Sequence, residues 1–392
     1  MKIQILLCLF FMHLYGIAGN QFTIDKGLSN NNIECILQDA DGFLWVGTWN
    51  GLNRYDGYSF EKFYTEEYKP SLPNNWITQL FQDSQGNIWV GTISGLGFYN
   101  KRSNTFETHK DIQFHYISGI VEDTHSNIWI SSSVGLYIIN SKTKQLQTFI
   151  SKEKQLLFTD LEELKIDNKG YVWAGCRQGI LKIDAHTQII KKHISLDWVK
   201  TIAFDTKGNI WCGTRTNGLV RIDTTTLQKK IFKHNPEQSN SIGSDNIWSI
   251  FIDKKHAVWI ACQNGFLNKY DTKRDVFIKK HDTRINNYTN EFKSITCMYE
   301  DKEGNIWLGF HRAGLYCIPK QTNTFEFYKS AMYANKKVDF SNVSSFAQHN
   351  EVLLFGSDGD GLFVYNTKTK DIDVFGQEKK ILSNNIISLY TH

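Results

Sequence analysis

The sequence predicts an all-β fold, a β-propeller of four-stranded antiparallel blades. One phrase recurs eight times, and its fullest copy, from Asp39 to Asp56, reads Asp-x-x-Gly-x-x-Trp-x-Gly-Thr-x-x-Gly-Leu-x-x-Tyr-Asp. The period of about 40 to 50 residues is typical of propellers and solenoids. Turn residues divide each unit into short apolar runs, as strands require. Tryptophan holds the same place in seven copies, and Leu354 takes it in the eighth: Trp45, Trp89, Trp129, Trp173, Trp211, Trp259 and Trp307.

The first unit shows how each blade is expected to form. Residues 33–38 are an apolar run between asparagines and an Asp-Gly turn, which indicates a strand. Residues 43–48, 52–55 and 59–63 are the next three strands. Gly51 closes the tight turn between the second and third strands, where a positive φ is expected. A lone sheet of this size cannot bury both faces, so the blades are expected to stack around an axis.

The recurrent side chains are predicted to be structural. Each repeated tryptophan is expected to be a wedge between neighbouring blades, because a large aromatic side chain dominates packing. Each Asp-x-x-Gly stretch is expected to be a turn in which the aspartate bonds to its own backbone. These turns lack the dense carboxylate ladder of a calcium loop, and Asp358-Gly359-Asp360-Gly361 in the eighth copy comes nearest to one. The sequence therefore predicts no metal and no cofactor.

The repeats also predict the domain organisation. Copies one to seven are expected to close a seven-bladed ring over residues 21–335, with residues 21–26 as the outer strand of the last blade. The eighth copy is expected to begin a second propeller, so that residues 336–392 are its first blade and part of the next. The alternative is one eight-bladed ring. The chain ends at His392, inside a ninth unit that opens at Leu382.

The N-terminus predicts export. Lys2 precedes an apolar run over residues 3–11, and Gly16-Ile17-Ala18 is a small-x-small cleavage site, so residues 1–18 are interpreted as a signal peptide. The apolar stretch is short for a membrane span. The protein is therefore expected to be periplasmic. The net charge of +4, without a basic run, argues against nucleic-acid binding.

Six cysteines remain after the predicted cleavage site, and no two of them form a C-x-x-C motif, so neither a redox centre nor a zinc site is indicated. Buried free thiols within strands are the expected state. Cys35 and Cys297 hold equivalent positions in copies one and seven. A disulfide between them would be compatible with the periplasm. Adjacent inner strands usually stand too far apart for such a bond.

Strand order places two sets of loops at one mouth of the ring. In an up-and-down blade, the turn between the second and third strands and the link to the next blade open on the same side. These loops are rich in Asn, Gln, Arg and aromatic residues, which suits a sugar, and arginines also favour a carboxylate or sulfate. Cleavage of a glycoside needs two facing carboxylates, for which only Asp245, Glu291 and Asp358 are loose candidates. The candidate ligand-binding residues are Trp49, Asn50, Trp76, Arg177, Gln178, Arg215, Asn217, Gln263, Asn264, His311 and Arg312.

The repeat resembles a known family. The stretch Gly27-Leu28-Ser29-Asn30-Asn31, followed by Trp45-Val46-Gly47-Thr48 and Gly51-Leu52-Asn53-Arg54-Tyr55-Asp56-Gly57, is close to the full pattern of the two-component regulator propeller repeat. The resemblance covers about residues 22–392. It implies the periplasmic sensor half of a hybrid two-component system that regulates polysaccharide use, truncated before its membrane span and histidine kinase.

The resemblance implies the function. The chain is expected to be a ligand-sensing propeller module that binds an oligosaccharide, to have no enzymatic activity of its own, and to be compatible with a homodimer. A membrane is expected to be reached only through C-terminal segments that follow in the full-length relatives. Two alternatives stay open: a periplasmic protein-interaction scaffold, and a secreted propeller glycosidase or lyase.

Overall fold

The computed structural model of the protein describes residues 20–113, 115–140, 142–143, 145–149, 160–280, 294–320, 330–333, 336–339, 343–357, 361–366, 368–369, 372–375 and 385–389. The predicted signal peptide, Glu291 and Asp358 lie outside these residues. The chain divides into two compact units, Met1–Thr322 and Asn323–His392. The domain boundary expected at residues 335 and 336 stays a prediction. The described residues include no helix that is long and apolar enough to cross a bilayer.

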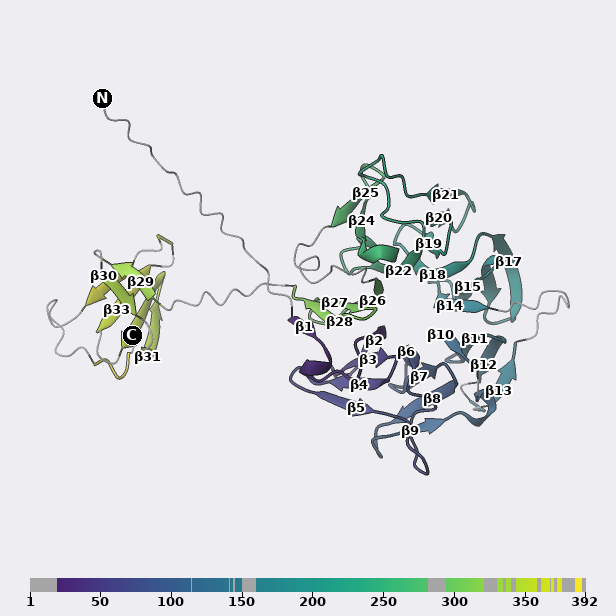
Figure 1. Ribbon diagram of the computed structural model, residues 1–392, viewed down its shortest axis with the longest axis horizontal. Coiled ribbons are helices and arrows are strands. Elements are labelled where there is room, and N and C mark those ends of the chain that lie inside the picture. Colours follow the sequence, from purple (N-terminus) through teal and green to yellow (C-terminus); the bar gives the residue numbers. More distant parts are fainter. Residues whose placement is uncertain are drawn as a thin grey trace. The chain divides into compact units, whose positions relative to one another are not determined.

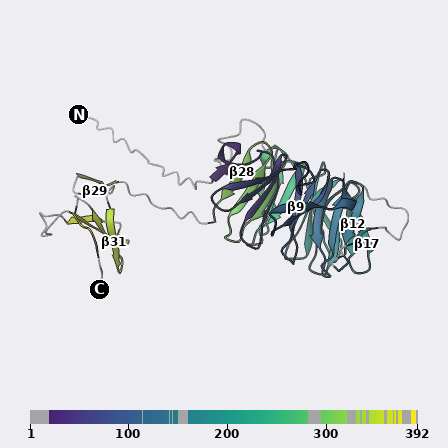
Figure 2. The same cartoon turned by 90° about the horizontal axis from the view of Figure 1, so that it is seen from below.

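Seven four-stranded antiparallel sheets surround a central axis in the first unit (Figure 1). In the side view these sheets stand next to one another in a single layer (Figure 2). Blades one to three consist of β2 (Ile33–Gln38), β3 (Leu44–Thr48), β4 (Gly51–Tyr55) and β5 (Phe60–Phe63); β6 (Ile77–Gln82), β7 (Ile88–Thr92), β8 (Gly95–Asn100) and β9 (Thr105–Thr108); and β10 (Ile117–Glu122), β11 (Ile128–Ser132), β12 (Gly135–Ile139) and β13 (Leu146–Thr148).

The remaining four blades repeat this plan, and the fold class predicted from the sequence is confirmed. Short 3-10 turns interrupt the connections at η1 (Ile24–Lys26), η2 (Lys110–Ile112) and η3 (Gln263–Gly265). Blades four to seven consist of β14 (Leu161–Ile166), β15 (Tyr171–Cys176), β16 (Gly179–Asp184) and β17 (Ile189–Ser195); β18 (Val199–Phe204), β19 (Asn209–Thr214), β20 (Leu219–Asp223) and β21 (Lys229–Phe232); β22 (Ile247–Ile252), β23 (Val258–Cys262), β24 (Leu267–Asp271) and β25 (Val276–Lys280); and β26 (Ile295–Glu300), β27 (Ile306–Phe310), β28 (Gly314–Ile318) and β1 (Asn20–Phe22).

The N-terminal strand closes the ring. β1 pairs antiparallel with β28, so that Phe22 lies opposite Leu315 and the last blade is completed from the start of the chain. Thr296 of blade seven donates a hydrogen bond to the carbonyl of Ile33 in blade one at 2.5 Å. This closure leaves no place for an eighth blade in the ring. The outer strand is shorter than expected over 21–26, because the chain leaves it at residue 23 and turns through η1 to reach β2.

The repeated tryptophans lie between blades, as predicted. Trp45, for example, is fully buried and packs with Ile77 and Tyr99 of the next blade. Trp307 of blade seven packs against Leu28 and Ile33 at blade one. Trp89 and Trp259 are partly exposed but still pack on the core of the following blade. Each blade therefore buries its sheet against its neighbour through one large side chain.

The repeated aspartate does more than form the expected turn. Asp39 accepts the backbone N–H of Phe43 on one carboxylate oxygen, at 3.0 Å, and the indole N–H of Trp45 on the other, at 2.8 Å. A buried indole N–H needs such a partner. The spacing of six residues between aspartate and tryptophan follows from this bond. It recurs in every blade, in the pairs Asp83–Trp89, Asp123–Trp129, Asp167–Trp173, Asp205–Trp211, Asp253–Trp259 and Asp301–Trp307.

The Gly-Thr-x-x-Gly part of the phrase also has a packing cause. A Cβ on Gly47 would lie 2.7 Å from the side chain of Ile77, so this glycine lets the next blade approach. The hydroxyl of Thr48 donates to the carbonyl of Gly51 at 2.7 Å and accepts the N–H of Asn50 at 3.1 Å. Gly51 has φ +104, in the region that favours glycine, as the sequence predicted.

The second unit contains a hairpin of β29 (Ser330–Tyr333) and β30 (Lys336–Asp339) and one four-stranded sheet. The sheet is formed by β31 (Val343–His349), β32 (Val352–Ser357), β33 (Leu362–Asn366) and β34 (Ile372–Phe375). Ser344 donates to the carbonyl of Ile386, and the N–H of Ile386 donates to the carbonyl of Ser357 at 2.8 Å. Ile386 therefore stands to this sheet as Ile77 stands to blade one.

The six cysteines of the described residues all carry free thiols. Cys35 and Cys297 lie on the adjacent inner strands β2 and β26, as the seven-bladed ring requires. Burial raises the pKa of both thiols, and the pKa of Cys297 rises to about 12. The two side chains are therefore neutral core residues, and no disulfide joins them.

Candidate functional site

Backbone hydrogen bonds bring the two predicted loop sets together at one mouth. The residue that follows the second strand of a blade donates its N–H to the carbonyl of the residue that precedes the innermost strand. Trp49 bonds in this way to Asn32 at 3.1 Å, and Arg215 bonds to Trp198 at 2.9 Å. Every such bond places one turn residue beside one link residue. The same bond joins Ile93 to Trp76, Ser133 to Tyr116, Gln263 to Asn246 and His311 to Ser294.

A β-bulge adds a third position to the mouth. The pairing of each innermost strand with its neighbour shifts register directly after its first residue, and bulges of this kind re-aim a side chain. Three of the bulged residues are small, and their hydroxyls donate to the next blade; Ser118, for instance, donates to the carbonyl of Leu161 at 2.5 Å. The other four bulged residues have no hydroxyl group and cannot make that bond. The bulged positions are Glu34, Thr78, Ser118, Glu162, Lys200, Trp248 and Thr296.

The innermost strands enclose a cavity of about 580 Å³ on the ring axis. Its lining includes the four large bulged residues, Glu34, Glu162, Lys200 and Trp248, together with Tyr116. The volume lies within the range of small-molecule sites. The indole N–H of Trp248 is buried and has no hydrogen-bond partner among the described residues. The cavity therefore offers both charged groups and an unused donor.

Blades six, seven, one and two supply an aromatic sector of the mouth, which we define as Trp49, Trp76, Trp248 and His311. The ring of Trp49 lies 4.6 Å from that of Trp76 and 5.1 Å from that of His311, centroid to centroid. Trp248 lies 6.2 Å from His311. The indole N–H of Trp49 donates to the carboxylate of Glu34, which fixes the ring. The result is a continuous, partly exposed aromatic surface.

Blades four and five supply a cationic sector, defined as Arg177, Trp198, Lys200 and Arg215. The guanidinium of Arg215 lies 4.4 Å from the centroid of Trp198, and that of Arg177 lies 5.2 Å from it. The indole N–H of Trp198 donates to Glu162 at 2.7 Å. One fixed indole thus holds two guanidinium groups near each other.

Burial sets the charges of the mouth. It raises the pKa of Glu34 and of Glu162, against the opposing effects of their tryptophan N–H donors and of Lys200. It lowers the pKa of Lys200, although the nearby carboxylates of Glu162 and Glu34 oppose this effect. Burial also lowers the pKa of His311, with a contribution from Arg312. These side chains are incompletely solvated, and a polar ligand could provide the interactions that water does not.

The structure places the predicted site residues in two groups. The first group makes the ring and cation–π contacts described above: Trp49, Trp76, Arg177, Arg215 and His311. Arg177 also forms an ion pair with Asp160 at 3.7 Å. The others occupy turn positions around the rim. Asn50, Gln178, Gln263 and Arg312 are exposed, Asn217 is partly exposed and bonds through its N–H to Thr214, and the side chain of Asn264 is outside the described set.

The bulged residues were missed by the sequence reasoning. Glu34, Glu162, Lys200 and Trp248 each follow the first aliphatic residue of an innermost strand, and alternation alone makes them ordinary strand residues. A comparison of the seven copies that form the ring would have shown hydroxyl residues at this position in three copies and large residues in four. Asp245, named as a loose carboxylate candidate, instead accepts the N–H of His234 at 2.7 Å within a loop.

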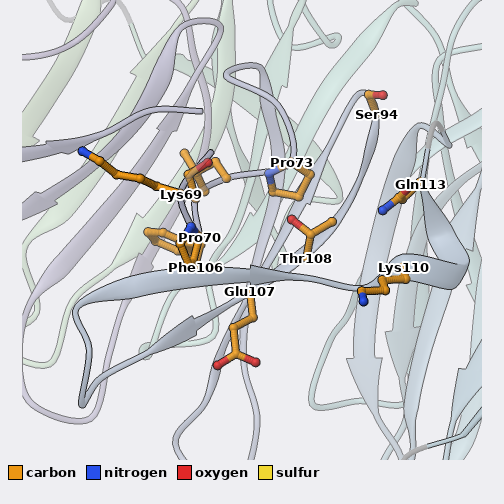
Figure 3. A pocket seen from close by; sticks show the side chains of 11 residues that line it. Lys69, Pro70, Pro73, Ser94, Phe106, Glu107, Thr108, Lys110 and Gln113 are labelled. Carbon is orange, nitrogen blue, oxygen red and sulfur yellow. The ribbon is translucent and has the colours of Figure 1, made fainter. Parts of the chain in front are cut away.

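A second hollow, of about 550 Å³, lies outside the ring cavity (Figure 3). The segment from Lys69 to Pro73 borders it on one side, and β9 and η2 border it on the other. Lys69 is engaged with Glu66 at 2.8 Å. Glu107 points away from Pro73 and Thr108 (Figure 3). This hollow lacks the convergent charged and aromatic groups of the mouth, so the mouth is the stronger candidate site.

Comparisons with known proteins agree with the repeat and the fold. Residues 27–50, 71–94 and 291–312 match the two-component regulator propeller family. A histidine kinase of Formosa agariphila, named histidine kinase P4, is 29% identical over 247 residues, which cover 59% of this chain and 17% of the kinase.

Solved structures show the same fold. The extracellular domain of a putative hybrid two-component system of B. thetaiotaomicron superposes with a TM-score of 0.64 at 24% identity, over 94% of this chain and 50% of that domain. An inactive variant of virginiamycin B lyase from Staphylococcus aureus has a TM-score of 0.59 at 12% identity, over 76% of this chain and 98% of the lyase. The chain spans half of the first structure and less than a fifth of the kinase.

Proposed function

We propose that this chain, which carries two-component regulator propeller repeats, is the ligand-binding module of a periplasmic sensor and binds an oligosaccharide at the mouth of its propeller. The observation that carries the proposal is the fixing of two mouth tryptophans by carboxylates. Glu34 orients Trp49 and Glu162 orients Trp198, at bulged positions where other blades have small hydroxyl residues. The bond of Glu34 lies within blade one, whereas that of Glu162 reaches the link that precedes the first strand of blade five.

The chemistry of the mouth supports a sugar. A pyranose has an apolar face that can lie on an indole, and hydroxyls at its rim that require polar partners. The aromatic sector provides such a surface in the rings of Trp49 and Trp76, whose planes are inclined by 34°. Arg177, Arg215 and Lys200 provide donors, and Glu34 and Glu162 provide acceptors. Because the tryptophans are held before a ligand arrives, little side-chain entropy would be lost on binding.

The sensor role is supported by the similarity to a histidine kinase and by the fold of the extracellular two-component domain. In this proposal, export follows from the predicted signal peptide, and the kinase belongs to a longer protein. Ligand binding would bias the kinase only through a difference in affinity between two sensor arrangements. A homodimer would supply two such arrangements.

Enzymatic activity is less well supported by the site. The lyase shares the fold at 12% identity, which carries no argument about chemistry. The carboxylates of Glu34 and Glu162 each accept an indole N–H, which is a positioning role. Turnover of a glycan that stops in Glu34→Gln or Glu162→Gln would support an enzyme instead.

The test is a screen of defined oligosaccharides by thermal shift, followed by calorimetry. A ligand that binds only the folded protein raises its melting temperature. We expect one class of glycan to do so, and we expect Trp49→Ala and Trp198→Ala to weaken its binding at least about tenfold. Tyr58→Ala is the control, because Tyr58 is 96% exposed in the turn between β4 and β5, which opens on the opposite face.

Two results would contradict the proposal. If no glycan shifts the melting temperature while a partner protein is captured stably, the chain is an interaction scaffold. If a glycan binds and both tryptophan variants bind it as tightly as Tyr58→Ala does, the ligand site lies away from the mouth.

A further inference from the structure

Two arginines of the cationic sector share one aromatic surface. Arg215 and Arg177 both lie within 5.2 Å of the centroid of Trp198. Stacking uses the face of a guanidinium and leaves the N–H groups at its edge available for other partners. Both guanidinium groups therefore lie against one indole, which Glu162 holds in place. The carboxylate of Glu162 is near enough to Arg215 for the charge of the arginine to oppose the rise of its pKa.

The acidic residues nearby are already engaged. Glu162 accepts the indole N–H of Trp198, and Asp197 accepts the hydroxyl of Thr216, which lowers its pKa. Asp160 lies 3.7 Å from Arg177, in an ion pair whose two side chains are 61% and 44% exposed. An exposed pair at that distance contributes little and is readily exchanged for another anion.

Arg215 differs from Arg177 in this respect. No ion pair or side-chain hydrogen bond of the Arg215 guanidinium is found within the part of the chain that the structure describes, and the residue is exposed. Its contact with the face of Trp198 and its unused N–H edge are the features of an anion-binding arginine. If Arg177 gave up its ion pair with Asp160, its guanidinium would provide a second set of N–H donors to the same anion.

The aromatic sector lies elsewhere on the ring. Trp49, Trp76 and His311 come from blades one, two and seven, whereas the two arginines come from blades four and five. The two sectors meet at Trp248 of blade six, where the ammonium of Lys200 lies 4.9 Å from the ring centroid. The aromatic surface carries no arginine stacked on it in the described residues, and it suits an uncharged sugar ring. The mouth is therefore divided into one part that suits an acid and one part that suits an apolar face.

Building on the proposed function, we infer that the ligand is an acidic oligosaccharide, bound in one orientation. Its carboxylate or sulfate is held by Arg215 and Arg177 against Trp198, and another sugar ring of the same chain lies on Trp49 and Trp76. The mouth thus selects for charge at one end of the ligand and for a planar apolar face at the other.

The test compares three tetrasaccharides by calorimetry: an oligogalacturonate, which carries carboxylates; a carrageenan oligosaccharide, which carries sulfates; and neutral galactotetraose. We expect one acidic probe to bind at least about tenfold more tightly than the neutral one. Arg215→Ala should remove most of that preference. Arg215→Lys should keep part of it, because lysine has the positive charge but not the paired N–H donors of a guanidinium. The acidic probe whose affinity falls in Arg215→Ala shows whether the bound anion is a carboxylate or a sulfate.

The matched control is Arg312→Ala. Arg312 was also a candidate from the sequence, but it is an exposed arginine of blade seven and stacks on no indole among the residues that the structure describes. We expect its loss to change the affinity for the acidic probe less than about twofold. Trp49→Ala should weaken the acidic and the neutral probe alike, because it removes the aromatic surface that both would use.

The outcomes separate this inference from the proposed function. If all three probes bind equally and Arg215→Ala changes nothing while Trp49→Ala weakens binding, the acidic ligand is wrong and the sugar site stands. If Arg312→Ala weakens acidic binding as much as Arg215→Ala does, the preference reflects the general charge of the rim, and the inference is overturned. If none of the three binds, the inference fails for both acid classes.

Discussion

The two faces of the propeller use the same repeat in opposite ways. On the face of the Asp-x-x-Gly turns, one side-chain bond is made seven times, always from the aspartate carboxylate to the tryptophan of its own blade. On the mouth face, a bond from backbone to backbone recurs beside the hydroxyl bond of Thr48 and its equivalents, and the other side chains differ from blade to blade. Trp49, Arg177 and His311 hold equivalent positions there.

This difference shows where the protein can vary. The turn face depends on the side chains themselves, because a buried indole N–H without its carboxylate would lose a hydrogen bond that water cannot replace. The mouth depends on amides and carbonyls, which every residue except proline supplies. The turn itself needs the hydroxyl of Thr48 and the positive φ of Gly51, but the residues between them can change without loss of the fold.

The largest expected difference between the faces concerns tryptophan. Trp211 is fully buried between blades five and six, and Trp211→Ala should destabilise the protein by about 3–5 kcal/mol. Trp49→Ala at the mouth should cost only about 1 kcal/mol, the value of an aromatic contact. Urea unfolding of both variants measures the two effects. Equal losses would show that the mouth tryptophan is also part of the core.

A smaller difference concerns the carboxylates. The buried carboxylate of Asp123 accepts the N–H groups of His125, Asn127 and Trp129, so Asp123→Ala should cost about 2–3 kcal/mol and leave ligand affinity unchanged. Glu162→Ala should cost less than about 1 kcal/mol, because Trp198 is partly exposed to water. It should nevertheless weaken ligand binding. Urea unfolding of both variants measures the loss of stability, and calorimetry measures the loss of ligand affinity.

The smallest difference is one of pH. Burial raises the pKa of Glu162 above its ordinary value of 4.5, so the folded protein binds this proton more tightly than the unfolded chain does. The resulting stability is present below pH 4.5 and is lost as the pH rises through the folded-state pKa. Glu162→Gln removes this dependence. The stability of the natural protein relative to the variant should therefore fall as the pH rises from 4.5 through the folded-state pKa.

Urea unfolding at several pH values measures that trend. Lys200 and Asp160, which contribute to the environment of Glu162, are present in both proteins, so the comparison isolates the glutamate. A relative stability that rises with pH would mean that the carboxylate is held ionised by its neighbours, and that the mouth is better solvated than its burial indicates.

Much of the fold could be predicted, because the repeat encodes it locally. The strands expected in the first unit at 33–38, 43–48, 52–55 and 59–63 agree with β2 to β5 to within one residue. The wedge role of Trp45 and the positive φ of Gly51 were also predicted correctly. Each of these features depends on residues within one unit or on its immediate neighbour in the ring.

The candidate site could be predicted only in part. Strand order alone placed Trp49, Arg177 and Arg215 on one rim, because loops at the same ends of strands share a face. Strand order did not predict the bulges at Glu34 and Glu162, because a bulge depends on how two strands pair and not on either strand alone. The repeated aspartate and tryptophan were also predicted to have separate roles, whereas the structure joins them by a hydrogen bond.

The sequence by itself determined the blade, its repetition and the mouth at which its variable loops would lie, since each follows from a local pattern of apolar, turn and polar residues. Only the tertiary structure decided how many blades close the ring and which side chains meet across it. Residues such as Trp49 and His311 are brought together by closure of the circle, and their contact depends on the angle between blades, which no single repeat specifies.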